Sequence, residues 1–291
     1  MSVSLEPFHS AVRQWFADAF AGPTRPQALG WPAIARGEST LILAPTGSGK
    51  TLSAFLWAID RVMFAPRPPS TGRCRVLYVS PLKALAVDVD KNLRRPIEGI
   101  TTVAAAAGHL HTVPTVAVRT GDTPRIERAR FGREPADILI TTPESLYLLL
   151  TSNAREALRS IETVILDEIH VLVPTKRGAH LAASLERLQV LCPRPLQRIG
   201  LSATQRPLDE VARFLGGAER RAPSLAETAY RPVTIVDARD RKALKLTIEV
   251  PVEDMARPAP FDRPGRSTEP PGRTSIWSSI HPRLLELIRG H

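Results

Sequence analysis

The strongest constraint on the fold of this chain is a loop of small and polar residues, Ala44-Pro-Thr-Gly-Ser-Gly-Lys-Thr51. The loop follows the apolar stretch Thr40–Ala44 and opens a stretch of helical spacing, Gly49–Met63. A glycine-rich turn between a buried strand and a helix aims successive backbone N–H groups at one point, where they can hold a phosphate. This order predicts an open sheet with a phosphate site at its edge.

Residues 1–229 continue the alternation of short apolar and longer amphipathic stretches, which predicts an α/β fold with a doubly wound, mostly parallel sheet. The expected strands have little polar alternation, as is typical of strands buried on both faces. They are Thr40–Ala44, Arg75–Val79, Thr115–Arg119, Asp137–Thr141, Thr163–Leu166 and Arg198–Leu201. The helices expected between them include Gly49–Met63, Ala84–Leu93, Ser145–Leu150 and Ala179–Leu191.

The pattern changes near Tyr230, so we expect an extension over residues 230–273 and a final helix within 274–291. The extension would hold two short strands, Val233–Val236 and Leu244–Val250, before a loop rich in proline, glycine and charge. Pro282 suits the first turn of the final helix, whose apolar face has little of the chain left to pack on.

The loop residues predict a nucleotide site with Mg²⁺. Backbone N–H groups of the loop would hold the β-phosphate, Lys50 would reach the β- and γ-phosphates, and the hydroxyl of Thr51 would bind Mg²⁺. The residues expected to bind ATP here are Thr46, Gly47, Ser48, Gly49, Lys50 and Thr51. The alternative is a glycine- and serine-rich turn without a ligand.

A second chemical feature is the stretch Thr163-Val-Ile-Leu-Asp-Glu-Ile-His170, in which a buried strand delivers two adjacent carboxylates at its carboxyl end. Ligands of open α/β sheets bind at that edge. We expect Asp167 to hold Mg²⁺, and Glu168 to orient and deprotonate an attacking water. The plain alternative is that these acids only cap the next helix.

These two motifs, with Leu201-Ser-Ala-Thr204 after a further strand, resemble those of superfamily 2 helicases. Four more segments are similar to helicase motifs in order and spacing: Pro23-Thr-Arg-Pro-Gln27, Ser80-Pro-Leu-Lys-Ala-Leu85, Thr120-Gly-Asp-Thr123 and Thr141-Thr-Pro-Glu-Ser-Leu146. The longer segments GWPAIARGESTLILAPTGSGKTLSAFLWAID and GLSATQRPLDEVARFLGG resemble the N-terminal part of the large helicase-related (Lhr) family of DEAD/DEAH-type helicases.

The resemblance implies a RecA-like first helicase lobe that uses ATP and Mg²⁺. It implies that Gln27 reads the adenine edge, and that His170, Ser202 and Thr204 couple the γ-phosphate to movement between two lobes. It also implies backbone contacts to one strand of DNA or of an RNA–DNA hybrid. The residues assigned to that strand are Pro81, Lys83, Thr120, Gly121, Thr142 and Pro143.

Several of these residues have simpler interpretations. The threonines and prolines also suit turns, Lys83 also suits a solvated surface, and a lone His170 also suits a structural hydrogen bond. Five arginines around Thr120 could form a basic track for phosphates or only a charged helix face. They are Arg119, Arg125, Arg128, Arg130 and Arg133. The N-terminal aromatic residues are expected to pack as core; they are Phe8, Trp15, Phe16 and Phe20.

Charge and composition agree with this interpretation. The chain has 39 basic and 29 acidic residues, a net charge of +10, which favours a polyanionic partner, nucleic acid before a membrane surface. It shows no membrane-length apolar run, no secretory signal and only two distant cysteines, so we expect a reduced, cytoplasmic protein without a membrane partner.

The expected function is the ATP-binding lobe of an ATP-dependent DNA/RNA helicase or translocase with a role in genome maintenance. The sequence is expected to end at the opening helix of a second lobe. The resemblance implies that this second lobe supplies the arginine fingers, and an arginine finger is worth about 10³–10⁵ in kcat. The chain alone is therefore expected to bind ATP and nucleic acid weakly and to unwind nothing. The alternative is a non-motor nucleic-acid-binding or docking module that keeps its ATP site as a switch.

Overall fold

The structure is a computed structural model of the 291-residue chain. It describes residues 5–69, 72–203, 207–220, 228–239, 248–249 and 277–290. Two compact units divide the chain, Met1–Arg239 and Asp240–His291. The first unit contains every expected chemical motif, since all of them lie before residue 205.

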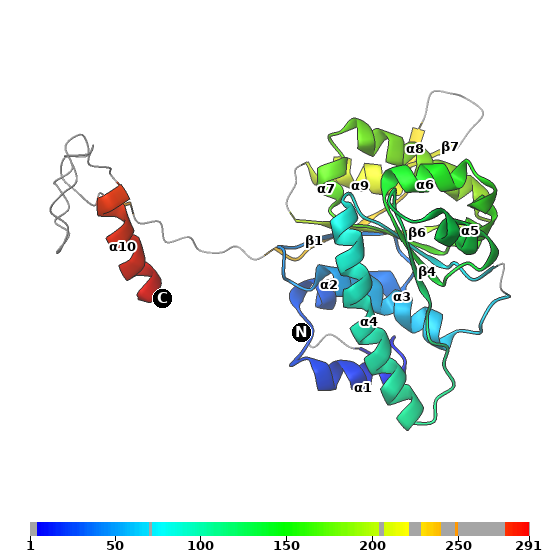
Figure 1. Ribbon diagram of the computed structural model, residues 1–291, viewed down its shortest axis with the longest axis horizontal. Coiled ribbons are helices and arrows are strands. Elements are labelled where there is room, and N and C mark those ends of the chain that lie inside the picture. The colour runs from blue at the N-terminus through cyan, green and yellow to red at the C-terminus, as the bar shows by residue number, and fades with distance from the viewer. Residues whose placement is uncertain are drawn as a thin grey trace. The chain divides into compact units, whose positions relative to one another are not determined.

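The first unit is built on a seven-stranded parallel sheet with the strand order β3-β4-β2-β5-β6-β1-β9 (Figure 1). Its strands are β1 (Thr40–Leu43), β2 (Val76–Val79), β3 (Val116–Arg119), β4 (Ile138–Thr141), β5 (Thr163–Leu166), β6 (Gln197–Ser202) and β9 (Thr234–Asp237). A separate antiparallel pair joins β7 (Ala218–Arg220) to β8 (Thr228–Tyr230). The predicted α/β fold with a doubly wound parallel sheet is confirmed.

Helices cover both faces of this sheet (Figure 1). One face carries α1 (Ser10–Ala19), α2 (Arg25–Ala35), α3 (Lys50–Phe64) and α4 (Lys83–Ala106). The other carries α5 (Arg125–Arg133), α6 (Pro143–Leu150), the 3₁₀ segment η2 (Asn153–Leu158), α7 (Ile169–Leu172), α8 (Lys176–Leu191) and α9 (Leu208–Gly216). Successive residues of β1 enter opposite cores: Ile42 packs in the first and Leu41 and Leu43 in the second.

All six strands expected in the α/β lobe are present within a residue or two of their predicted bounds. The four expected helices are also present, but α4 is much longer than Ala84–Leu93 because its apolar face continues through Ile97 and Ile100 into the first core. The helix continues past Pro96, which predicts a break when only local preference is considered.

The expected boundary after residue 229 does not match the compact unit, which runs to Arg239. The reason is β9, which lies within the expected extension but pairs in parallel with β1 and becomes an edge strand of the main sheet. Most of the other expected strand, Leu244–Val250, lies outside the described residues.

In the second unit, α10 (Trp277–Arg289) matches the expected final helix but starts before Pro282, which lies inside it rather than in its first turn. The leucine and isoleucine side chains of the expected apolar face of α10 are exposed: Leu284, Leu285, Leu287 and Ile288. Within the described part of the chain, no helix is long and apolar enough to span a membrane.

Candidate functional site

The loop between β1 and α3 has the conformation that a phosphate-binding turn requires. Gly47 and Gly49 adopt positive φ angles of 76° and 83°, and Gly49 immediately precedes the first helical residue, Lys50. A Cβ on Gly49 would lie 2.9 Å from Nε2 of Gln27, so close packing adds to the backbone constraint. The hydroxyl of Ser48 donates to the carbonyl of Pro45 at 2.6 Å and closes the turn.

Lys50 and Glu168 come together from distant parts of the chain. The Nζ atom of Lys50 lies 3.4 Å from Oε1 of Glu168, and the Lys50 side chain is only 6% exposed. Glu168 has φ 46° and ψ 43°, and it is the one non-glycine residue in the described regions with a positive φ. A non-glycine residue in the left-handed region stores strain, and such strain is common at functional sites.

Asp167 lies beside Glu168 in a buried polar environment. The hydroxyl of Tyr78, on β2, donates to Oδ2 of Asp167, and the backbone N–H of Glu168 donates to Oδ1 at 2.9 Å. Burial raises the pKa of the Asp167 carboxyl, while the hydrogen bond from Tyr78 and the charge of Lys50 act in the opposite direction. Tyr78 is not among the predicted site residues, because a tyrosine inside an apolar strand is typical of a side chain buried in the core.

His170 connects the second carboxylate to β6. Its Nδ1 lies 3.2 Å from Oε2 of Glu168 and 3.4 Å from the backbone nitrogen of Ala203. Ser202, at the end of β6, is buried, and its hydroxyl is without a hydrogen-bond partner among the described residues. The structure thus brings His170 and the Ser202 segment together, while Thr204 lies outside the described residues.

A cavity of about 710 Å³ opens beside this cluster. Its walls include the loop residues from Thr46 to Thr51 except Ser48, together with Glu168 and Gln27. Gln27 is buried, and its Oε1 accepts from the backbone N–H of Thr24 at 2.9 Å. Asp167 is buried and is not among the lining residues.

The N-terminal aromatic residues divide between core and cavity. Phe8 and Phe16 are buried in the first core, as expected. Phe20 is 43% exposed, and both Phe20 and Trp15 line the cavity that contains the phosphate loop. Helical spacing predicts burial of one face, but it cannot show that the end of α1 borders a cavity formed by α3 and α4.

The segments assigned to nucleic acid follow three neighbouring strands. Pro81 and Lys83 follow β2, Thr120 and Gly121 follow β3, and Thr142 and Pro143 follow β4. Because β3, β4 and β2 are adjacent and parallel, these segments share one edge of the sheet. The phosphate loop and the two carboxylates follow β1 and β5 at the same edge.

Most of these assigned side chains are occupied within the protein. Pro81, Thr120, Thr142 and Pro143 are buried, and Thr142 caps α6 by accepting from the backbone N–H of Ser145. Lys83 is exposed, and its Nζ pairs with Oδ1 of Asp122 at 2.7 Å. Loop backbone and the Lys83 head group are therefore the parts of this edge that a phosphate chain could meet.

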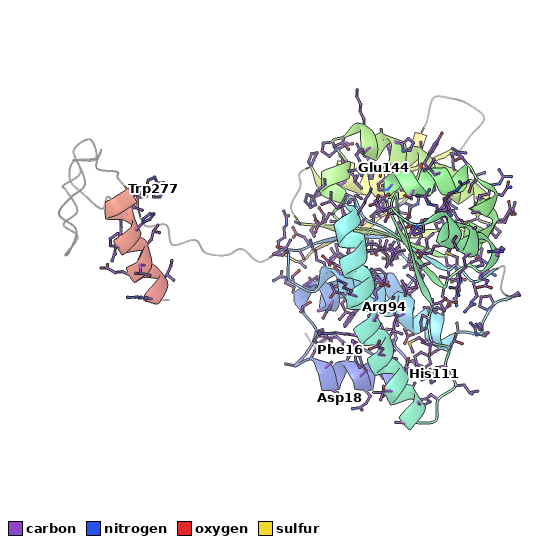
Figure 2. All side chains as sticks on the ribbon, in the orientation of Figure 1. Phe16, Asp18, Arg94, His111, Glu144 and Trp277 are labelled. Carbon is purple, nitrogen blue, oxygen red and sulfur yellow. The ribbon has the colours of Figure 1, made fainter. Side chains whose placement is uncertain are left out.

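Two arginines that brace these segments were not predicted in that role. Arg177, in the first turn of α8, donates to the carbonyl of Pro81 at 3.0 Å and to Glu144 at 2.6 Å. Glu144 lies on α6, on the upper side of the sheet in Figure 2. Arg128 donates to the carbonyls of Gly121 and Thr123. The contacts of Arg177 join residues far apart in sequence, so no local pattern predicts them, whereas Arg128 contacts residues only five and seven positions before it.

The five arginines of the expected basic track have different environments. Arg128 braces the loop, Arg130 pairs with Glu134 at 3.3 Å, and Arg119 is partly buried at the end of β3. Arg125 and Arg133 are exposed on α5. At least two of these five arginines, Arg128 and Arg130, already have partners within the protein, and the basic track stays a prediction.

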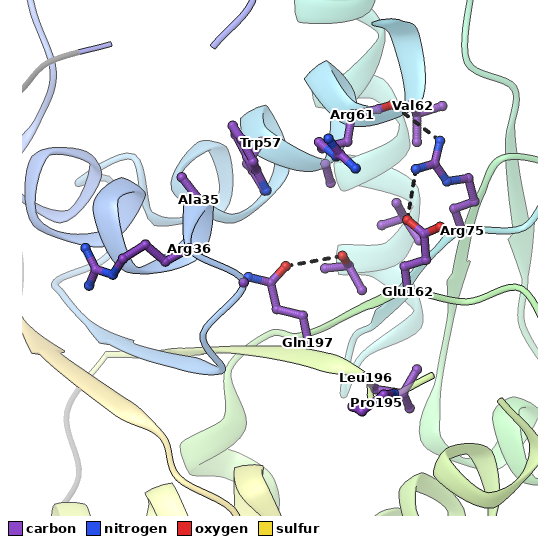
Figure 3. Close-up of a pocket in the computed structure, with 14 residues that line it drawn as sticks. Ala35, Arg36, Trp57, Arg61, Val62, Arg75, Glu162, Pro195, Leu196 and Gln197 are labelled. Carbon is purple, nitrogen blue, oxygen red and sulfur yellow. Dashed lines mark hydrogen bonds and ion pairs between the residues drawn. The ribbon is translucent and has the colours of Figure 1, made fainter. Parts of the chain in front are cut away.

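A different cavity, of about 430 Å³, lies at the amino edge of the sheet (Figure 3). Its polar residues already pair with one another: Arg75 donates to Glu162 at 2.9 Å and to the carbonyl of Arg61 at 3.3 Å. The side chain of Gln197 lies 3.4 Å from Thr163. Ligands of open α/β sheets bind at the opposite edge, so this cavity is not the candidate site.

The donor chemistry at the phosphate loop fits Mg²⁺. The carboxylate of Asp167 and the hydroxyl of Thr51 are hard oxygen donors, which Mg²⁺ prefers, and this ion usually keeps several waters and phosphate ligands. Two protein oxygens are therefore a sufficient set. Among the described residues, no group of three histidine, cysteine or acidic side chains suits a protein-only metal cage.

Comparison with known proteins agrees with this geometry. The chain is 52% identical over 284 residues to the Lhr helicase/probable uracil glycosylase of Mycolicibacterium smegmatis, covering 98% of this chain and 17% of that protein. It is 42% identical over 285 residues to the ATP-dependent helicase Lhr-Core of Methanothermobacter thermautotrophicus, covering 97% of this chain and 30% of that protein. The chain thus spans less than a third of these relatives.

A solved structure of Mycobacterium smegmatis helicase Lhr bound to ssDNA and AMP-PNP aligns with a TM-score of 0.76 and 50% identity, over 99% of this chain and 33% of that one. Mss116p bound to ssRNA and AMP-PNP, at 15% identity and a TM-score of 0.64, shares the fold. The DEAD/DEAH box helicase family matches residues 24–212, which include the phosphate loop and the paired carboxylates. This chain therefore belongs to the DEAD/DEAH box helicase family.

Proposed function

We propose that this chain is the ATP-binding and ATP-hydrolysing lobe of a nucleic-acid helicase or translocase. The observation that carries the proposal is the approach of Lys50 to Glu168, 3.4 Å apart at the wall of the large cavity. This contact brings together Lys50, which is expected to bind the phosphates, and Glu168, which is expected to orient the attacking water. The pair comes from segments that follow β1 and β5, two strands separated by β6.

The residues divide the chemistry between them. The N–H groups of the phosphate loop and Nζ of Lys50 hold the β- and γ-phosphates, and Glu168 orients the attacking water and accepts its proton. Thr51 and Asp167 hold Mg²⁺, which when bound neutralises phosphate charge. Gln27 reads the adenine edge, and Phe20 and Trp15 offer the base apolar faces at the same cavity.

His170 gives the site a route to the rest of the motor. Its Nδ1 faces both the carboxylate of Glu168 and the backbone N–H of Ala203. When Nδ1 carries a proton it donates to Glu168, and when it does not it accepts from Ala203. A change in the charge that Glu168 carries or meets therefore changes which contact His170 makes. We propose that this choice transmits the state of the γ-phosphate to the segment of Ser202 and Thr204.

Nucleic acid is proposed to bind along the three adjacent segments after β3, β4 and β2. Their backbone N–H groups and Lys83 suit phosphates without regard to base identity. The M. smegmatis Lhr structure, described as bound to ssDNA and AMP-PNP, supports a single strand as the ligand. A contact to phosphate must replace the Lys83–Asp122 pair, which is exposed and therefore weak.

The test is ATP turnover by the full chain with and without single-stranded DNA. We expect slow turnover that single strands stimulate, retained nucleotide binding in Glu168→Gln with turnover lost, and weakened binding in Lys50→Ala. Glu210→Gln changes an exposed glutamate of α9 and serves as the charge-matched control. The alternative, a docking module with ATP as a switch, predicts nucleotide binding without stimulated turnover. Robust strand separation by the chain alone would contradict the expectation of weak activity.

A further inference from the structure

A groove runs along the free edge of β3, beside α5, and no motif of the nucleotide site accounts for it. Its volume is about 460 Å³, and all five residues from Thr115 to Arg119 line it. The opposite wall includes Glu127, Arg130 and Phe131 of α5. These five residues, the four of β3 and the one before it, span about 13 Å, which is the length of a short extended peptide.

The edge of β3 has backbone groups available for pairing. β3 pairs with β4 alone in the described sheet, and its four residues are half-buried, whereas those of β1, β2 and β4 are fully buried. The N–H of Ile138 donates to the carbonyl of Thr115, so in the parallel ladder the backbone groups of Val116 and Val118 point away from β4. The carbonyl of Val118 accepts from the hydroxyl of Thr123.

Guanidinium groups line both ends of this groove. Nη1 of Arg119 is buried and makes no hydrogen bond within the described structure, whereas Nε of Arg73 lies 3.5 Å from Oδ1 of Asp137 as an ion pair without hydrogen-bond geometry. Both residues line the groove, next to the end and the start of β3. A buried donor without a partner is unfavourable, so an acceptor that enters the groove and reaches Nη1 of Arg119 is stabilised there.

The electrostatics of Arg119 favour an anionic acceptor. Burial lowers the pKa of its guanidinium, and the nearby charge of Arg128 lowers it further. Arg130 and Arg73 are already paired, with Glu134 at 3.3 Å and Asp137 at 3.5 Å. Arg119 is therefore the cation in the groove whose charge an incoming carboxylate can balance.

We propose that the groove between β3 and α5 binds an extended, acidic peptide segment of a partner protein, which adds to the sheet as a strand beside β3. Main-chain hydrogen bonds to the N–H and carbonyl of Val116 and to the N–H of Val118 supply affinity, and a carboxylate on Arg119 supplies specificity. This interaction is independent of the proposed ATP chemistry. The groove is connected to the loop of Gly121 through Thr123. Thr123 lines the groove, and its hydroxyl accepts from the backbone N–H of Thr120 at 2.9 Å.

The test selects binders from a displayed library of random linear heptapeptides on the full chain, with counter-selection on the double variant Arg73→Gln/Arg119→Gln. We expect enrichment of peptides that combine β-branched residues with aspartate or glutamate. Selected peptides should bind the double variant at least tenfold more weakly. The charge-matched control Arg125→Gln/Arg133→Gln alters two exposed arginines of α5 that do not line the groove, and it should keep full affinity.

Amide exchange followed by NMR distinguishes strand addition from simple charge attraction. A bound peptide should slow exchange at the N–H groups of Val116 and Val118, and methylating the peptide nitrogens should abolish that protection. Unchanged melting of the double variant establishes that it is folded. No acidic enrichment, equal binding to both double variants, or protection elsewhere on the chain would each overturn the proposal.

Discussion

At the scale of single residues, the site depends on side chains that hold its acids in place. Tyr78 is the clearest case, because its hydroxyl donates to Asp167 while its ring packs 5.0 Å from that of Phe55. Burial raises the pKa of the Asp167 carboxyl, and the hydrogen bond from Tyr78 works against that effect. Tyr78 is thus expected to keep Asp167 ionised for Mg²⁺.

Replacing Tyr78 with phenylalanine removes this hydrogen bond and keeps the ring. We expect the pKa of Asp167 to rise further, and the Mg²⁺ concentration needed for half-maximal nucleotide binding to increase about tenfold near pH 6, with a smaller increase at pH 8. Titration of a fluorescent ATP analogue with Mg²⁺ at both pH values measures this. Tyr230→Phe, at an exposed tyrosine that does not line the nucleotide cavity, is the control. An Mg²⁺ requirement identical to that of the wild type would contradict the proposed role.

Asp60 provides a prediction about stability that is separate from catalysis. Burial raises its pKa to about 6 from the usual value of 3.8, although the backbone N–H of His9 donates to it at 2.7 Å. A carboxyl whose pKa is raised by folding stabilises the fold at low pH, and that contribution is lost as the pH rises through about 6.

Asp60→Asn keeps an oxygen acceptor for His9 but cannot ionise. We therefore expect the variant to be more stable than the wild type at pH 8 by about 1–3 kcal/mol, with the difference vanishing near pH 4. Urea unfolding across this range measures the effect, with Asp18→Asn at an exposed position of α1 as the control. A pH-independent difference between Asp60→Asn and wild type would show that ionisation of Asp60 is not its source.

At the scale of elements, the position of α1 is fixed by close packing on α4. A Cβ added to Gly99 would lie 2.2 Å from Nε1 of Trp15, so the indole rests directly on the glycine. Trp15 and Phe20 also line the nucleotide cavity. The α1–α4 contact therefore determines the shape of one cavity wall.

Gly99→Ala is expected to push α1 away from α4. Overpacking costs about 1–3 kcal/mol, and the altered wall should weaken nucleotide binding several-fold. Adding Trp15→Phe, a smaller ring, should restore most of the stability lost. Gly132→Ala, in α5, adds a Cβ that makes only an ordinary 3.7 Å contact with Ala154 of η2, so it should not destabilise the fold. Thermal unfolding and nucleotide titration test these outcomes, and equal effects at both glycines would refute the special role of Gly99.

The helices, strands and loops differ in how far the local sequence predicts them. The strands were predictable because burial on both faces leaves continuous apolar runs, as in Ile138–Thr141. The phosphate loop and the Asp167–Glu168 pair were predictable because their chemistry is local. The roles of Tyr78, Arg177 and Trp15 were not, since each depends on a partner more than fifty residues away. The place of β9 also depends on pairing with a distant strand, β1.

At the scale of the whole lobe, strand order divides the carboxyl edge of the sheet into two halves. The segments proposed for nucleic acid follow β3, β4 and β2, and those proposed for ATP follow β5, β6 and β1. β2 and β5 are neighbours at the boundary, and Tyr78 on β2 bonds to Asp167 after β5. The two proposed functions therefore meet at one strand pair, where a shift of either half alters the other.

The extent of the folded lobe gives the last prediction. Residues 230–239 add β9 to the sheet beside β1, bury Val236, and supply Arg231, which pairs with Glu186 at 2.7 Å. Glu186 also neutralises Arg198, which is 1% exposed, so this pair helps to balance a buried cation. A chain of residues 1–239 should therefore unfold in one cooperative transition close to that of the full chain.

A chain of residues 1–229 lacks this strand and ion pair, and we expect it to melt roughly 10 °C lower, because each kcal/mol shifts the melting temperature of a lobe this size by about 2–4 °C. Calorimetry of the two truncations beside the full chain gives the comparison. Equal melting temperatures for 1–229 and 1–239 would mean that β9 pairs without stabilising the sheet, and the lobe would then end where its sequence pattern changes. A lower value for 1–229 alone would place the end of the lobe after β9, because the edge of β1 would then need that strand for full stability.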